Sequence, residues 1–137
     1  MLTVDLLEPH ETERAAKIFH RDGFVCLKNA LTPAQLAFAQ AGAQRVIKEQ
    51  TDADPERAGN RGHHRYSFGN QSHHPEWAML MDLATVLPVV EAIWGSADFT
   101  CTGAGGDYSL PKAERQALHA DMGDFFKDPL GQVDFRA

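Results

Sequence analysis

The chain is poor in cysteine, in long apolar runs and in positive charge, and each shortage excludes a class of protein. Its 137 residues include only two cysteines, Cys26 and Cys101. Two cysteines do not make a disulfide framework, so we expect a reducing, cytoplasmic location with both thiols buried in apolar stretches. No apolar run approaches the length of a membrane span, and residues 1–13 lack the apolar core of a secretory signal. The net charge of −6 argues against nucleic acid or a membrane as partner.

Familiar catalytic signatures are also missing. There is no Ser/His/Asp or Cys/His arrangement, and the glycines at 103–106 lack the spacing of a phosphate-binding loop. Glycines on extended chain weaken a regular strand and allow close backbone approach, which leaves room beside them for a small molecule. We therefore expect Asp107 and Tyr108 to reach a pocket. The alternative is a turn with exposed polar neighbours.

Hydrophobic residues make up 43% of the chain and charged residues 23%, as in an ordinary globular protein. Apolar spacing and turn residues predict where the elements lie. We expect helices at 8–21, 33–49, 75–83 and 87–94, loops at 51–61 and 62–74 (with a short strand near 65–68 as an alternative for part of the second), and strands at 24–27, 99–102 and 117–122.

Helix ends carry the clearest local signals. Thr32 can cap a helix that begins at Pro33, and Gln35 completes a capping box. Gly95 is placed to end the helix at 87–94. Trp77 and Trp94 fit core positions on short helices.

Helices come first and β-structure later, which predicts an α+β fold with helices on one face of a sheet. We interpret residues 1–137 as a single domain. Residues 1–96 are expected to be mainly helical with one short strand. Residues 97–137 are expected to hold the first strands of the core sheet.

The last of the predicted strands carries a His and an Asp two positions apart, His119 and Asp121. Residues two apart on a strand point to the same face, so both side chains can reach one ion. An imidazole and a carboxylate are two of the three ligands of a mononuclear non-haem iron(II) site. Gln116, three residues earlier, is a candidate for a hydrogen bond inside the same pocket.

A histidine-rich segment is the second candidate for function. His63–His64 and His73–His74 enclose a stretch with Arg65 and Phe68. One interpretation is an active-site flank in which His64, Arg65 and Phe68 contact the substrate, with His64 or Arg65 recognising an anionic group. The alternatives are a solvated loop, in which the histidines are neutral polar residues, and an independent metal site.

The order of these features resembles the N-terminal half of the phytanoyl-CoA dioxygenase family of Fe(II)- and 2-oxoglutarate-dependent oxygenases. The matching pieces are Phe19–Val25 (FHRDGFV), Leu31–Leu36 (LTPAQL), the helix from Leu87-Pro88 to Trp94-Gly95, and His119-Ala120-Asp121. The resemblance spans almost the whole chain, and its specificity comes from the ordered combination.

The resemblance implies a double-stranded β-helix, or jelly roll, of which this chain holds the beginning. It implies that His119 and Asp121 bind Fe(II), and that the enzyme uses 2-oxoglutarate to hydroxylate a C–H bond of a small-molecule substrate. We expect Asp107, Tyr108 and Gln116 to lie near the cosubstrate. The family's second His ligand and its basic 2-oxoglutarate-binding residue lie further downstream, and no residue after Asp121 matches them.

We therefore expect the chain to be a fragment of a longer enzyme. Half a jelly roll leaves strand edges unpaired, so a homodimer or a complementing chain is expected to cover them. The alternative is a non-catalytic binding or assembly module derived from the N-terminal half of the same fold.

Overall fold

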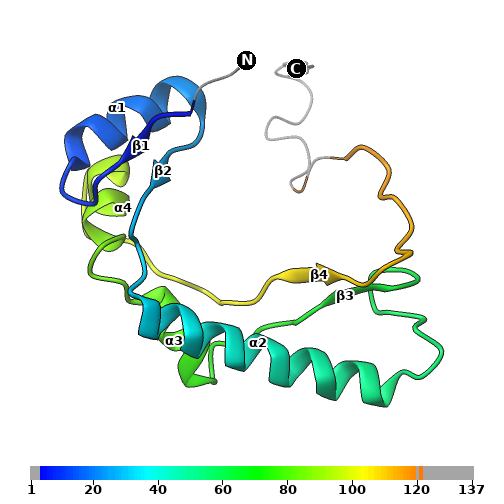
Figure 1. Ribbon diagram of the computed structural model, residues 1–137. Helices are drawn as coiled ribbons and strands as arrows, with labels where there is room; N and C mark the ends of the chain where they lie inside the picture. The colour runs from blue at the N-terminus through cyan, green and yellow to red at the C-terminus, as the bar shows by residue number, and fades with distance from the viewer. Residues whose placement is uncertain (1–3, 120, 122–137) are drawn as a thin grey trace.

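The computed structural model describes residues 4–119 and 121, which contain four helices and two two-stranded sheets. The elements follow one another around an open arc (Figure 1). In chain order they are β1 (Leu6–Leu7), α1 (Thr12–Asp22), β2 (Cys26–Leu27), α2 (Pro33–Ala53), β3 (Arg65–Ser67), α3 (Pro75–Met81), α4 (Leu87–Trp94) and β4 (Asp107–Ser109).

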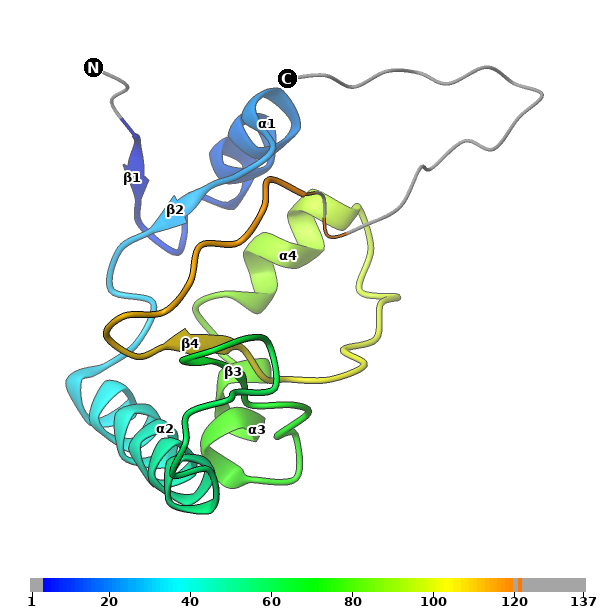
Figure 2. The same ribbon diagram turned by 90° about the vertical axis from the view of Figure 1, so that its right-hand side faces the viewer.

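One arm of the arc joins the N-terminal segment to α4. β1 and β2 pair in parallel, with Leu6 opposite Cys26 and Leu7 opposite Leu27. α1 packs beside α4, as Figure 2 shows. Their apolar faces enclose a cluster with Leu7, Ala15 and Val89 at its buried centre. This burial brings together segments about 80 positions apart in the sequence, and it is the main apolar contact of this arm.

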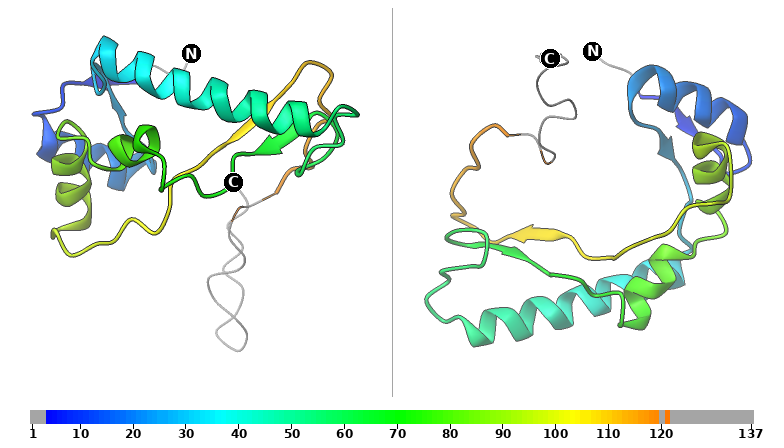
Figure 3. Two further views of the ribbon diagram at one scale, coloured as in Figure 1. Left: turned by 90° about the horizontal axis from the view of Figure 1, so that it is seen from below. Right: turned by 180° about the vertical axis from the view of Figure 1, so that it is seen from behind.

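The other arm contains α2, α3 and the antiparallel pair β3–β4. Figure 3 shows β3 and β4 between α2 and the inner side of the arc. Tyr66 of β3 lies directly opposite Tyr108 of β4, and their rings stack with centroids 5.0 Å apart. Phe68 bridges this pair to Trp77 of α3. Trp77 is buried, and its indole N–H donates to the carbonyl of Gly105 at 3.3 Å. A second, aromatic core therefore fixes β4 against α2 and α3.

The helix ends agree with the sequence. The Thr32 hydroxyl accepts from the Gln35 amide, and the Gln35 side chain accepts from the Thr32 amide, so the predicted capping box is present. α4 spans the predicted residues, and Gly95 ends it with φ +79°, the left-handed conformation that glycine adopts without strain.

Several predictions were wrong. The predicted strand at 99–102 is not a strand; β4 lies further on, at 107–109, where it meets β3. Residues 117–119 and 121 are not in a strand either, and residue 122 lies outside the described part of the chain. α2 continues past residue 49 to Ala53, because Thr51 donates back to the Ile47 carbonyl and Lys48 pairs with Asp52 on the added turn.

Two burial predictions also failed. Trp94 is 66% exposed and is the last residue of α4. Cys101 is exposed on irregular chain and Cys26 is half-buried; neither forms a disulfide. Within residues 4–119 and 121, no helix combines the length and the apolar character that a membrane crossing requires.

Candidate functional site

His119 and Asp121 converge without the help of a strand. The distance from His119 Nε2 to Asp121 Oδ1 is 3.3 Å. His119 Nδ1 donates to the carbonyl of Ala117 at 2.8 Å, since a carbonyl oxygen can only accept. In a neutral ring this hydrogen bond leaves the lone pair on Nε2, the atom that faces the carboxylate. Both side chains are accessible, at 47% and 96% exposed.

This spacing fits two ligands of one metal ion. Two donors bound at right angles, each about 2.1 Å from an ion, lie about 3.0 Å apart. The observed 3.3 Å is close to that value. Within the described residues, no group of three or more His, Cys, Asp or Glu side chains is placed to hold a metal. A complete site therefore needs at least one further ligand from outside this set.

Four of the other predicted site residues line one pocket. Arg65, Asp107, Tyr108 and Gln116 surround a cavity of about 160 Å³, together with Arg61, Tyr66 and Ser109. The sequence placed Arg65 at the substrate and the other three near the cosubstrate. In the structure Arg65 and the three predicted cosubstrate residues share a single cavity. His64, Phe68, His119 and Asp121 are not among its lining residues.

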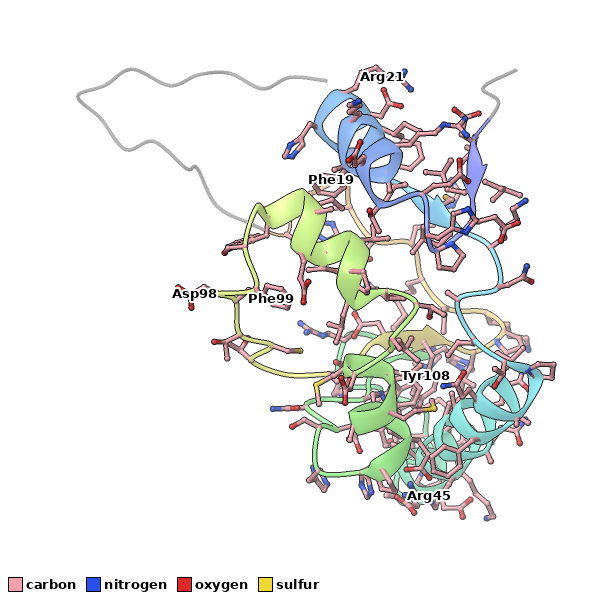
Figure 4. All side chains as sticks on the ribbon, turned by 90° about the vertical axis from the view of Figure 1, so that its left-hand side faces the viewer. Phe19, Arg21, Arg45, Asp98, Phe99 and Tyr108 are labelled. Carbon is pink, nitrogen blue, oxygen red and sulfur yellow. The ribbon has the colours of Figure 1, made fainter. Side chains whose placement is uncertain are left out.

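The register of β3 and β4 explains this grouping. Arg65 pairs with Ser109 and Ser67 pairs with Asp107, so these side chains share one face of the two-stranded sheet. Tyr66 and Tyr108 lie between them on the opposite face, toward α2. There the Tyr108 hydroxyl donates to Gln50 Oε1 at 2.9 Å (Figure 4, in which Tyr108 is labelled). Arg65, Asp107 and Ser109 line the pocket from the first face, and Tyr66 and Tyr108 also contribute to its lining.

The loop before β3 is held by Asp54, the residue that ends α2. Its carboxylate accepts from the Gly59 amide at 2.8 Å, the Ala58 amide at 3.2 Å and the Tyr66 hydroxyl at 2.7 Å. These donors, the Gly59 amide first and the Tyr66 hydroxyl second, lower the pKa of Asp54. Burial and the same carboxylate raise the pKa of Tyr66. The loop that carries Arg61 is therefore tied to α2 and to β3, the strand that begins at Arg65.

The remaining predicted site residues lie beside the pocket. His64 has φ +61°, which is uncommon for a residue other than glycine, and its Nδ1 is buried without a hydrogen-bond partner among the described residues. Its ring contacts His63, with centroids 4.3 Å apart. Phe68 packs between Trp77 and Tyr108 and lines a different, more apolar groove against α2 and α3. His64 thus neighbours the cavity, while Phe68 belongs to the aromatic core.

Sequence reasoning missed Arg61 and Asp54. The sequence held a signal for Arg61. Gly62 favours a tight turn between Arg61 and Arg65, and such a turn can bring two basic residues four positions apart to the same place. The sequence held no such signal for Asp54, because an Asp between the end of a helix and a proline is usually interpreted as part of a solvent-exposed loop. The expected close backbone approach is confirmed at Gly105, where a side chain would collide with the backbone carbonyl of Gly69. The space beside this glycine is therefore filled by the chain itself and, contrary to the prediction, is not left for a small molecule.

A scan against models of known protein families, a search of characterised proteins and a search of solved structures each found no significant match to this chain. The resemblance to the dioxygenase family therefore stays a prediction. The function has to be argued from the residues themselves.

Proposed function

We propose that this chain supplies two iron ligands, His119 and Asp121, to an Fe(II)- and 2-oxoglutarate-dependent dioxygenase that hydroxylates a small molecule. The observation that carries the proposal is the 3.3 Å approach of His119 Nε2 to Asp121 Oδ1, with Nδ1 engaged by the Ala117 carbonyl. The order of sequence motifs supports it.

Each of the two residues has a definite role in this proposal. The Ala117 carbonyl holds the His119 ring in the tautomer that presents Nε2. The Asp121 carboxylate adds a negative charge and a second donor beside it. Bound iron and 2-oxoglutarate would supply the oxidation of an unactivated C–H bond by O₂. A second His and a basic residue for the cosubstrate would come from outside the described residues.

The pocket over β3 and β4 is close in sequence to the proposed metal ligands. Gln116 lines the pocket and is three residues from His119. Three residues of fully extended chain span at most about 10–11 Å, so the two Cα atoms are no further apart than that. This short separation supports the proposal that a small molecule held in the pocket extends toward the metal, with Asp107, Tyr108 and Gln116 near cosubstrate or substrate.

The proposal is tested by anaerobic titration of the protein with Fe(II) in the presence of 2-oxoglutarate, followed by visible absorbance. Binding of both to one site gives a weak charge-transfer band. We expect the band, weak at the concentrations of the isolated chain, in the wild type and in the control variant His20→Gln, whose His lies on α1. We expect its loss in His119→Ala. Equal spectra for the wild type and His119→Ala would remove His119 from the metal site and overturn the proposal.

A second candidate function is a non-catalytic binding or assembly module. The observation that favours it is the pairing of strands: each described sheet has only two strands, so each strand has one edge without a described partner strand. Such a module would bind its partner equally well with and without iron. In either function we place the protein in the cytoplasm, because its two free cysteines suit a reducing compartment.

A further inference from the structure

We propose that the pocket over β3 and β4 binds a small oxyanion, a carboxylate or phosphate, carried by the substrate, and that Arg61 and Arg65 recognise it. This inference rests on the proposed function for the identity of the ligand as substrate. It extends that function by naming the chemical class of the substrate, an anionic small molecule.

Local backbone geometry brings the two arginines together. The Arg61 amide donates to the Arg65 carbonyl at 3.1 Å, and the Arg65 amide donates to the Gly62 carbonyl at 2.8 Å. These bonds close a tight turn, and both arginine side chains line the pocket. The turn requires glycine at position 59, where φ is +67° and a side chain would collide with the carbonyls of Gly62 and Arg65.

The charges in the pocket favour an anion. Arg65 is half-buried, and its guanidinium forms no ion pair with any carboxylate of the described residues. Arg61 lies 4.0 Å from Asp107 Oδ2, which is a long and exposed pair. Two arginines and one aspartate are therefore the charged residues that line the pocket. A half-buried cation without a counter-ion is stabilised by a ligand of opposite charge, and the guanidinium fork matches carboxylate and phosphate oxygens in geometry.

The other polar groups of the pocket determine which further hydrogen bonds a ligand can form there. The Tyr66 hydroxyl is engaged by Asp54 and the Tyr108 hydroxyl by Gln50, so neither is free for a ligand. Ser109 and Gln116 remain as neutral hydrogen-bonding groups at the rim. A volume of about 160 Å³ admits a charged head group and a few carbon atoms, but not a whole coenzyme. The rest of such a substrate would leave the pocket past Gln116, in the direction of His119 along the chain.

The test is a titration of the full chain, without metal, with acetate and with inorganic phosphate at constant ionic strength balanced by chloride. NMR follows the arginine Nε–H signals and the Gln116 side-chain amide. We expect saturable shifts at Arg61, Arg65 and Gln116 for at least one probe. Arg65→Gln should weaken that probe at least tenfold, Arg65→Lys should weaken it less, and the control Arg21→Gln on α1 should bind as the wild type does. Equal affinity in Arg65→Gln and Arg21→Gln would overturn the inference.

Two further experiments are needed. The first distinguishes a substrate anion from the cosubstrate, and the second distinguishes a failure of this inference from a failure of the proposed function. With Fe(II) bound under anaerobic conditions and one equivalent of 2-oxoglutarate added, too little to compete as a free carboxylate, probe binding that persists supports a substrate group, whereas stoichiometric displacement assigns the pocket to the cosubstrate and overturns the inference. His119→Ala should leave probe binding unchanged. If His119→Ala leaves the Fe(II) band unchanged while the probe still binds, only the proposed function fails. If the band behaves as expected but no probe binds, only this inference fails.

Discussion

At the scale of single residues, Asp54 organises the loop beside the pocket although it does not line the pocket itself. Three donors converge on its carboxylate, two from the loop backbone and one from the buried Tyr66. An acidic side chain that accepts two backbone amides after a helix acts as a loop organiser, and its charged form is the one that these donors stabilise. The position of Arg61 and Arg65 therefore depends on the ionisation of a residue outside the pocket.

This dependence predicts how stability changes with pH. The pKa of Asp54 is below its ordinary value of 3.8 in the folded chain, so the unfolded chain binds a proton more readily. The stabilisation is complete above the unfolded pKa and is lost as the pH falls through the lowered folded pKa. We expect Asp54→Asn to remove this part of the acid dependence, measured by urea unfolding between neutral and strongly acid pH.

The matched control is Asp52→Asn, which removes an exposed carboxylate two residues earlier. It should leave the Asp54 contribution in place and reproduce the acid limb of the wild-type curve. An Asp54→Asn protein whose stability falls with acid as steeply as that of the wild type would show that the loop is not held by this carboxylate.

Only some of the side-chain interactions could be predicted from the sequence. The capping box at Thr32 and Gln35 could be predicted because its partners are three residues apart and interact locally. Convergence of His119 and Asp121 was also expected, but the structure achieves it on irregular chain, without the predicted strand. Asp54 could not be recognised, because its partner Tyr66 comes from a strand twelve residues away and only the folded loop brings the two together.

At the scale of elements, the contact of α2 with α3 depends on one glycine. Gly42 of α2 is buried, and a Cβ added there would lie 2.6 Å from the Cγ of Glu76 on α3. Glu76 is itself buried and pairs with Arg45 at 3.0 Å (Figure 4, in which Arg45 is labelled). Its own backbone amide, and then Arg45, lower the pKa of Glu76. The acidic side chain thus lies across the glycine and reaches an arginine one turn further along α2.

We predict that Gly42→Ala destabilises the fold although alanine is the better helix former. Helix propensity favours alanine by about 1 kcal/mol, while forcing a methyl group into a filled space costs about 1–3 kcal/mol. The net expectation is a loss of up to about 2 kcal/mol in the free energy of unfolding. Urea denaturation monitored by tryptophan fluorescence measures it, since Trp77 lies on α3.

A double-mutant cycle provides the control. In a Glu76→Gly background the Cβ, Cγ and Cδ atoms that crowd position 42 are all absent, so Gly42→Ala should be neutral or stabilising there, by up to about 1 kcal/mol. A penalty of the same size in both backgrounds would mean that Glu76 does not limit the space at Gly42.

Elements were predictable where their signals are local. α4 was predicted at its observed bounds, because Pro88 and Gly95 mark its two ends. The strands could not be predicted in this way. β4 forms only by pairing with β3, about 40 residues earlier, and a three-residue strand is too short to show an alternating pattern in the sequence. The predicted strand at 99–102 has the right composition but no partner strand among the described residues.

At the scale of the whole molecule, apolar burial is divided between the two arms of the arc. One cluster is centred on Leu7, Ala15 and Val89, and the other on the aromatic residues around Trp77. Large apolar side chains remain exposed on the described surface, and they are Val4, Leu6, Phe24, Leu36, Phe38, Leu80, Trp94 and Leu118. With two small clusters and open strand edges, the chain has surface suited to a second protein segment.

We therefore predict that the isolated chain self-associates. Light scattering after size-exclusion chromatography should show a mass that rises with concentration, and the melting temperature should rise with it over about a hundredfold range, because association stabilises the folded form. A monomer with a concentration-independent melting temperature would contradict this prediction.

Joint binding of one metal ion by His119 and Asp121 is the basis of the proposed function, and paramagnetic NMR tests it directly. Mn(II) would be added to the full chain in substoichiometric amounts, and the broadening of individual side-chain signals followed. We predict that the His119 imidazole and the Asp121 carboxyl group broaden first and together. Broadening centred on the histidines at 63–64 and 73–74, with His119 and Asp121 unaffected, would contradict the account.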